Sequence, residues 1–331
     1  MSAMTMNENI NLMDVESPSV AADRASNATT TFSTIRVEFG PQNALVGGLD
    51  TIRMAAVKLR NQRSETGMRL PMPVVSIIAE LGVGKTIGAE TLAAMRNPTD
   101  PDDKRRPVLL AELDGTGLQI SVPQAILKAL HKANWSHARK SSLAWERAFR
   151  ALKEHEVEIV IFDEMNRAAR RASIAAVIGA DIMDMLLHGE AAVAFLGTAE
   201  AKQVFNRVPA LKDRLKSPVV MKALDWWDVQ PGGERDILLD FLDEMDGAMV
   251  ARGLIATKAG LNGRTTADML WQVCRGRLRP LCQLLEEAVY LLHLANDDLI
   301  LDHKILAQAV ENYAIENEHI AYNPFKGELP Q

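Results

Sequence analysis

A glycine-rich stretch that ends in lysine and threonine has residue types that point directly to phosphate chemistry. Residues 79–86 read Ala-Glu-Leu-Gly-Val-Gly-Lys-Thr and follow the apolar run VVSIIA. They match the phosphate-binding pattern G-x-x-x-x-G-K-[ST] except at the first position, where Ala79 replaces glycine. Gly82 and Gly84 let the backbone turn so that successive N–H groups converge on a β-phosphate. The helix that follows adds its positive N-terminal end.

This loop therefore predicts a site for ATP and Mg²⁺. The Lys85 ammonium is expected to reach the β- and γ-phosphates, and the Thr86 hydroxyl is expected to coordinate Mg²⁺. An ordinary glycine turn before a helix is the alternative interpretation. The residues of the loop expected to bind the nucleotide are Gly82, Val83, Gly84, Lys85, Thr86 and Ile87.

A second motif supports nucleotide hydrolysis. The apolar run VEIVIF at 157–162 ends in Asp163-Glu164. A hydrophobic strand can deliver an aspartate to the Mg²⁺ shell and a glutamate that polarises the attacking water, so Asp163 is a predicted metal ligand and Glu164 a predicted catalytic residue. An acidic pair at a strand end means little alone, but the two motifs in this order favour a nucleoside triphosphatase.

A third polar residue follows the run AAVAFL at 191–196. Thr198 comes after Gly197 at the end of this expected strand, which would lie between the two motifs. A nucleophilic water must be positioned as well as activated, so Thr198 is a candidate to hold it from the other side. The alternative is that Thr198 is simply the N-cap of the next helix.

Composition limits the class of protein. The chain has 331 residues, 47% hydrophobic and 24% charged, which describes about two globular domains and excludes a fibrous or wholly disordered protein. The net charge of −6 argues against a polyanion as the main partner, although residues 202–222 carry six Lys or Arg against Asp213 alone. Two cysteines provide no disulfide framework, and no long apolar run or secretory signal is evident, so we expect a cytoplasmic protein without a membrane segment.

The elements that must position these residues follow from apolar periodicity. Short, wholly apolar runs separated by helices are typical of a parallel sheet covered on both faces. The expected strands are 74–79, 107–113, 157–162 and 191–196, and the expected helices around them are 45–63, 85–96, 122–134, 141–154 and 170–188. After residue 224 only helical spacing is found, in 234–252, 266–274, 277–295 and 303–318.

Four regions result from this pattern. Residues 1–35 are polar without a sustained period and are expected to be a disordered arm. Residues 36–223 form the α/β nucleotide-binding domain, and residues 224–319 form a small all-helical lid domain. Residues 320–331 contain two prolines and a glycine and are expected to be an extended tail that docks on a partner, or a frayed terminus.

The order of these motifs resembles the AAA+ ATPases, and more narrowly the TnsC/TniB family of transposon-encoded ATPases. The residues that carry the resemblance are AELGVGKT, VIFDE, FLGT, DRLKSP, the Arg275-Gly276-Arg277 stretch and the NPF near the C-terminus. The resemblance implies a P-loop AAA+ domain with a central parallel sheet flanked by helices, followed by a helical lid. It also implies an ATP-dependent regulator of DNA transposition that forms a ring or filament on double-stranded DNA through non-specific backbone contacts. The implied protein partners are a transposase and a target-selection adaptor, which includes an RNA-guided complex among its options.

In such an assembly an arginine of the neighbouring subunit stabilises the transferring phosphoryl group, and hydrolysis is completed across the subunit interface. The resemblance leaves Arg214 or Arg207 for this role. It assigns Arg277 to the γ-phosphate from within the same chain. Two regions are candidates for DNA contact, the basic stretch after Glu164 and the polar loop 115–121, although the basic stretch is equally well explained as a solvated turn. The expected DNA-binding residues are Arg167, Arg170, Arg171, Thr116 and Gln119.

Two other classes of function fit the same motifs. One is an AAA+ ATPase of DNA replication that resembles helicase loaders, which would associate with a replicative helicase instead of a transposase. The other is a nucleotide-dependent interaction switch with no role on DNA. Rings or filaments on duplex DNA would distinguish the transposition regulator from this switch.

Overall fold

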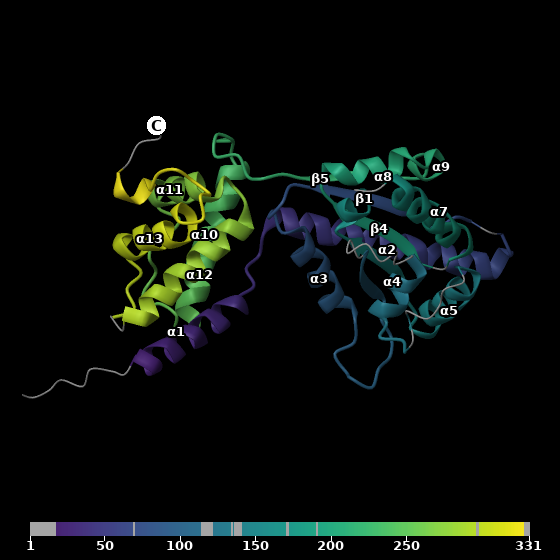
Figure 1. The fold of residues 1–331 in the computed structure, drawn as a ribbon, viewed down its shortest axis with the longest axis horizontal. Helices are drawn as coiled ribbons and strands as arrows, with labels where there is room; N and C mark the ends of the chain where they lie inside the picture. The colour runs from purple at the N-terminus through teal and green to yellow at the C-terminus, as the bar shows by residue number, and fades with distance from the viewer. Residues whose placement is uncertain are drawn as a thin grey trace, which may run out of the picture. The chain divides into compact units, whose positions relative to one another are not determined.

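A computed structural model describes residues 18–68, 70–113, 122–133, 135, 141–169, 172–189, 191–295 and 298–327. Its internal contacts divide the chain into two compact units. The nucleotide-binding unit comprises residues 38–224 together with 277–279, and the helical unit comprises 1–37, 225–276 and 280–331. Figure 1 shows the sheet within the first unit and the helices of the second, and each unit is described by itself.

The nucleotide-binding unit is built on a parallel sheet. Its strands are β1 (Val74–Ala79), β2 (Val108–Glu112), β3 (Ile159–Asp163), β4 (Ala192–Gly197) and β5 (Val219–Met221). They lie in the order β2-β3-β4-β1-β5, and every pairing is parallel. All residues of β1 and β4 are buried, which explains why these runs are apolar, apart from Ser76, instead of alternating. The predicted α/β fold with a central parallel sheet is confirmed.

The fifth strand was missing from the sequence expectation. β5 has only three residues, follows Pro218 and pairs with β1 at the edge of the sheet. Val220, in the middle of the strand, is 55% exposed. A three-residue run that is half exposed has neither the length nor the continuous apolar character by which a buried strand is recognised.

Helices surround this sheet. They are α2 (Gly40–Thr66), α3 (Lys85–Arg96), α4 (Val122–Ala129), α5 (Ser141–Glu154), α6 (Met165–Ala169), α7 (Ala172–His188), η2 (Ala199–Ala201), α8 (Lys202–Asn206) and α9 (Pro209–Lys212). α2 is longer than the expected 45–63, since Pro41 begins it and a left-handed Gly67 ends it. The helix expected over 170–188 corresponds to α7, and α6 precedes it as a separate short helix.

Ion pairs attach α2 to its neighbours. The guanidinium of Arg53, 8% exposed, donates to Glu158, which immediately precedes β3, and to Asp50 at 2.7 Å. Asp50 also accepts from Arg96 in α3 at 2.6 Å. These two arginines hold the pKa of Asp50 below its ordinary value despite the opposing effect of burial. α2 is therefore fixed against both the sheet and the helix that follows the phosphate-binding loop.

The helices of the helical unit are α1 (Pro18–Ser33), α10 (Glu234–Ala251), α11 (Arg264–Cys274), α12 (Leu278–Ala295), α13 (His303–Val310), a π-helical turn over Glu311–Ile315, and η4 (Pro324–Lys326). The first two residues of α12 group with the nucleotide-binding unit. Leu285 and Leu292 of α12 are fully buried, as expected for the apolar stripe of this helix. Among the described residues, no helix combines the length and the apolar character needed to cross a membrane.

α1 corrects the expectation of a disordered arm. Residues 18–33 are helical, and Ala25, Ala28 and Phe32 are buried at helical spacing. Arg24 Nε donates to the carbonyl of His293 in α12 at 2.8 Å. Only three apolar side chains anchor this otherwise polar helix, so its periodicity is weak in the sequence. The rest of the expected arm before residue 18 lies outside the described residues.

The tail corrects a second expectation, because residues 320–327 are folded onto the helical unit instead of extended. The side chain of Asn323 is completely buried, and its Nδ2 donates to Ala307 O at 2.9 Å and to Glu311 Oε1 at 2.8 Å. Phe325 is buried with its ring 4.9 Å from that of His303. The Asn-Pro-Phe residues therefore pack against other residues of the same chain.

Candidate nucleotide-binding site

The phosphate-binding loop connects β1 to α3 at the carboxyl end of the parallel sheet. Gly82 has φ 81° and Gly84 has φ 93°, values that residues with a Cβ rarely adopt. Gly84 is the residue that precedes α3, and Lys85 is the first residue of the helix. The two glycines therefore occur where the turn requires them, at the positive end of a helix.

Lys85 lies inside the site. Its side chain is 7% exposed, and its Nζ is 3.7 Å from Glu164 Oε1. A lysine that is so deeply buried normally requires an anionic partner. Here the partner is the carboxylate predicted to activate water, so the predicted phosphate-binding cation and the predicted catalytic carboxylate are neighbours.

Thr86 and Asp163 come together from separate elements. The Thr86 hydroxyl, in the first turn of α3, donates to Asp163 Oδ2 at the end of β3 at 2.6 Å. A hydroxyl and a carboxylate are oxygen ligands of the kind that Mg²⁺ prefers, and they are adjacent here. The donor set therefore fits Mg²⁺, and the two residues predicted as its ligands lie side by side.

Glu164 has an unusual backbone. Its φ is 56°, a left-handed conformation that is uncommon for a residue other than glycine or asparagine and that is typical of functional sites. Glu164 Oε2 lies 3.3 Å from Asn166 Nδ2 and 3.6 Å from Arg167 Nε. Its Oε1 faces Lys85, so both carboxylate oxygens have partners within the chain.

β4 lies between β1 and β3, which puts Thr198 between the two motifs. Gly197 lets the end of β4 pack closely against Ala201 and Met165, because a Cβ added there would lie 2.7 Å from the Cβ of Ala201 and 3.4 Å from that of Met165. Thr198 precedes η2, but its side chain makes no capping hydrogen bond. By position Thr198 is the N-cap residue of η2, as the alternative interpretation expected, although its hydroxyl does not form the capping bond. Its role in holding a water stays a prediction.

The two candidate trans-acting arginines lie on a basic surface. Arg207 and Arg214 are exposed, and neither forms an ion pair with any residue that the structure describes. The lysines of the same segment are also exposed, namely Lys202, Lys212, Lys216 and Lys222. Neither arginine has a hydrogen bond or ion pair to Lys85 or Glu164, whose only ion-pair partners among the described residues are each other and Arg167.

Arg277 has contacts within the nucleotide-binding unit. Residues 277–279 group with this unit, and the backbone N–H of Arg279 donates to the Gly82 carbonyl at 2.8 Å. Arg277 is half-buried and has a partner of its own. The backbone next to the predicted γ-phosphate contact is thus bonded to the phosphate-binding loop.

The predicted DNA-binding residues are only partly described. Arg167 lies on α6, and its side chain is 41% exposed. The other four residues predicted to bind DNA lie outside the described residues: Arg170, Arg171, Thr116 and Gln119.

One contact of the loop was missed by the sequence reasoning. Gln42 Nε2, in the first turn of α2, donates to the Gly84 carbonyl at 3.2 Å. Pro41 signals the start of that helix, but nothing in the linear sequence connects Gln42 with a glycine so far along the chain. The sheet order and the packing of α2 on α3 create this contact.

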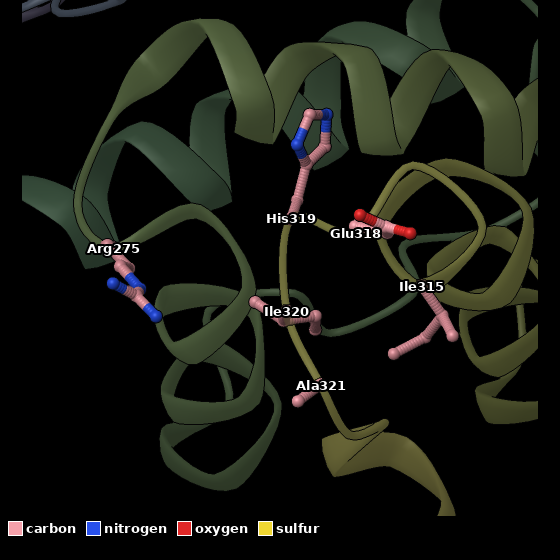
Figure 2. Close-up of a pocket in the computed structure, with 6 residues that line it drawn as sticks. All are labelled: Arg275, Ile315, Glu318, His319, Ile320 and Ala321. Atoms are coloured by element: carbon pink, nitrogen blue, oxygen red, sulfur yellow. The ribbon is translucent and has the colours of Figure 1, made fainter.

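The helical unit has a cavity of its own, with a volume of about 380 Å³. Figure 2 shows the six side chains that line it, with Arg275 and His319 on different segments. The lining residues are Arg275, Ile315, Glu318, His319, Ile320 and Ala321. None of them was predicted to bind nucleotide or DNA.

Solved structures with a similar fold include two ORC proteins and a Cdc6 protein. The ORC2 protein of Aeropyrum pernix, in ADPNP-ADP complexes, is 14% identical, with 90% of this chain and 72% of that chain covered and a TM-score of 0.56. The ORC1 protein of the same organism, in complex with DNA, is 11% identical, with 86% and 69% covered and a TM-score of 0.57. Cdc6p of Pyrobaculum aerophilum is 12% identical, with 88% and 74% covered and a TM-score of 0.54.

The strand order and the helical region give the chain a fold like that of the AAA+ ORC and Cdc6 structures. A family profile described as bacterial TniB protein matches residues 51–225, more than half of the chain. The chain belongs to the TniB family, whose members are transposition-associated AAA+ proteins. No curated protein sequence matches it.

Proposed function

We propose that this chain is an ATP-dependent, DNA-binding regulator of transposition that assembles on target DNA and recruits or activates the transposase. The observation that carries the proposal is the convergence of Lys85, Thr86, Asp163 and Glu164 in one site. Membership of the TniB family gives the biological setting. AAA+ membership implies ATPase activity.

ATP binding is supported by the loop geometry and by the ADPNP-ADP complexes described for the ORC2 protein of similar fold. Lys85 and the backbone N–H groups of residues 82–86 bind the phosphates, with Val83 and Ile87 beside them. Thr86 and Asp163 hold Mg²⁺, which neutralises charge on the phosphates when it is bound. Arg277 is assigned to the γ-phosphate.

Hydrolysis requires a positioned water. Glu164 accepts a proton from the water while the oxygen of the water forms a bond to the γ-phosphorus, and Thr198 holds the same water. The bond from the γ-phosphorus to the β–γ bridging oxygen breaks, and its electron pair leaves with ADP. The proton then passes to the released phosphate, which restores the carboxylate.

The catalytic arginine comes from a neighbouring copy. Arg214 and Arg207 are exposed in the basic segment 202–222 and form no ion pair with the described residues, so either can serve a neighbour in a ring or filament. This arrangement couples hydrolysis to assembly.

DNA binding is supported by the DNA complex described for the ORC1 protein and by the exposed Arg167 on α6. Arg170, Arg171, Thr116 and Gln119 complete the proposed contact set. Backbone contacts need only one or two cations per subunit, since an assembly repeats them, and the net charge of −6 is therefore compatible with DNA. A transposase and a target-selection adaptor or RNA-guided complex are the proposed protein partners.

A complementation experiment tests the shared active site. Glu164→Gln removes the water-activating carboxylate but leaves ATP binding intact, and Arg214→Ala removes the arginine that is supplied to the neighbour. Each variant alone should lack ATP hydrolysis on DNA, and an equimolar mixture should regain it, because an E164Q subunit still supplies Arg214 to an R214A neighbour.

The same experiment with Arg207→Ala identifies which arginine acts. If R214A alone hydrolyses ATP normally and R207A does not, Arg207 has the role. If neither mixture exceeds the activity of its separate components, hydrolysis is not completed across subunits by these arginines. Near-normal turnover of E164Q alone would contradict the assignment of the catalytic carboxylate.

A further inference from the structure

Two large apolar side chains are exposed on the loop that leads into α10, residues 225–233, which we call the Trp227 loop. Trp227 is 73% exposed, and Val229, two positions further on, is 52% exposed. The preceding Trp226 is buried, with its ring centroid 6.5 Å from that of Trp271 and 5.7 Å from the Arg235 guanidinium. Trp226 therefore anchors the loop, and within the described part of the chain no ring or cation packs on Trp227.

Hydrogen bonds fix the conformation of the Trp227 loop. Asp225 Oδ1 accepts from the N–H of Trp227 at 2.9 Å, and Asp228 Oδ2 accepts from the N–H of Glu234 at 3.0 Å. Glu234 Oε2 in turn accepts from the N–H of Asp225 at 2.6 Å, which closes the loop on the first turn of α10. Because the backbone is held in this way, a partner that binds Trp227 has little conformational entropy to remove. Such a tryptophan is typical of the central residues of protein interfaces.

The surface around Trp227 is acidic. The loop and the first turn of α10 carry four carboxylates against Arg235 alone, and none of the four forms an ion pair with a residue that the structure describes. They are Asp225, Asp228, Glu234 and Asp236. Carboxylates repel a phosphate backbone and attract cations, so the occupant that fits this loop is a basic protein surface and not DNA.

The chain carries such a surface in the basic segment 202–222. Its six cations are exposed and have no ion pair to any described residue: Lys202, Arg207, Lys212, Arg214, Lys216 and Lys222. Val220, 55% exposed, adds an apolar side chain among them. The segment therefore matches the loop in both charge and apolar character. A cation of the segment can lie over the Trp227 ring, as Arg235 lies over Trp226.

We propose that the Trp227 loop of one copy of this chain binds the basic segment 202–222 of the next copy. The proposal rests on the proposed function, to whose assembly it adds a contact that does not touch the nucleotide. The loop and the segment are different surfaces, and every copy carries both. The contact is therefore heterologous, and its repetition builds a ring or a filament.

The first test measures self-association of the purified full chain with ATP by sedimentation velocity, with and without a short duplex. Trp227→Ala should raise the Kd for self-association about thirtyfold, the usual effect of removing a tryptophan from the centre of an interface. Trp227→Phe keeps an aromatic face and should retain most of the affinity. Raising the salt concentration should weaken association of the wild type, because charges of opposite sign meet at the contact.

Ile300→Ala is the matched control. Ile300 is a 54% exposed apolar residue of the helical unit outside the Trp227 loop, so its removal should leave self-association unchanged. Thermal unfolding midpoints equal to that of the wild type show that the variants are folded.

The second test mixes two defective chains. Lys212→Glu combined with Lys216→Glu reverses two charges of the basic segment and leaves Arg207 and Arg214 in place. Each variant alone should stay monomeric at a concentration at which the wild type assembles. An equimolar mixture with W227A should stop at heterodimers, because the intact segment of W227A fills the intact loop of K212E/K216E. The two ends that remain free are then both defective.

Three results would overturn the contact alone. The first is wild-type assembly of W227A or of K212E/K216E, and the second is a mixture that stays monomeric or grows beyond heterodimers. The third is binding of duplex DNA by K212E/K216E that is much weaker than that of W227A in fluorescence anisotropy, which would assign the segment to DNA. A wild-type chain that stays monomeric with ATP, both with and without DNA, would instead overturn the assembly in the proposed function and the contact with it.

Discussion

Gly84 connects the backbone geometry of the phosphate-binding loop to stability and nucleotide affinity. Its φ of 93° is unfavourable for any residue with a Cβ, and an added Cβ would overlap the Nε2 of Gln42. We therefore expect Gly84→Ala to destabilise the nucleotide-binding unit and to weaken ATP binding.

The magnitude has two parts. A left-handed conformation costs alanine about 1–2 kcal/mol. Displacement of the Gln42 amide also breaks its hydrogen bond to the Gly84 carbonyl, which contributes about 0.5–1.5 kcal/mol. The free energy of unfolding should fall by about 1.5–3.5 kcal/mol in total. If the empty loop relaxes to another backbone conformation to relieve this strain, ATP must restore the strained conformation when it binds. The Kd for ATP should then rise about tenfold or more.

The assay is hydrogen exchange at the amides of β1 and β4, which reports the unit that contains the loop, combined with a titration of ATP. Gly47→Ala is the matched control, because Gly47 lies in α2 with nothing within 4 Å of an added Cβ. That substitution should stabilise the same unit by about 0.5–1 kcal/mol.

A double variant separates the two parts. Gln42→Ala removes the overlap and the hydrogen bond but leaves the φ of Gly84 unchanged, so G84A in the Q42A background should cost only about 1–2 kcal/mol. If G84A changes the unfolding free energy by less than about 0.5 kcal/mol and leaves the Kd for ATP unchanged, the geometry described for this loop is wrong.

Two further predictions concern buried carboxylates. Asp246 is completely buried and accepts hydrogen bonds from the backbone N–H groups of residues 259–261. Asp246→Ala should therefore destabilise the helical unit by roughly 3 kcal/mol. Hydrogen exchange at the amides of α10 measures this change, and an unchanged exchange rate would contradict it. Burial raises the pKa of Asp181 above 3.8, opposed by hydrogen bonds from Trp145 and Val122. The folded chain therefore holds the Asp181 proton more tightly than the unfolded chain does, and the free energy of unfolding should fall as the pH rises from about 3.8 through the raised pKa. Asp181→Asn should lose this pH dependence. A variant whose stability changes with pH as the wild type's does would refute the prediction.

The sheet and its chemistry were predictable for a common physical reason. Wholly apolar runs announce strands that are buried on both faces, and parallel strands present their carboxyl ends at one edge. Lys85, Thr86, Asp163 and Glu164 all follow or end such runs, so their approach could be predicted before the geometry was seen.

Other features depend on contacts that have no local pattern. β5 is recognisable only by its pairing with β1. α1 is held by three buried apolar side chains, two alanines and a phenylalanine, within a polar sequence. Gln42 reaches Gly84 because α2 packs on α3. Arg167 looked like a DNA contact alone, and its approach to Glu164 becomes visible only when the left-handed turn at Glu164 places α6 beside the carboxylate.

The central claim is that ATP drives assembly of this chain on duplex DNA. Electron microscopy of the purified protein with duplex DNA tests it most directly, with ATP, with ADP, and with Lys85→Ala in ATP as the control that lacks the phosphate-binding cation. Rings or filaments should form on DNA with ATP and the wild-type chain, and should be absent with K85A. DNA that stays bare in the presence of ATP and wild-type protein would contradict the account.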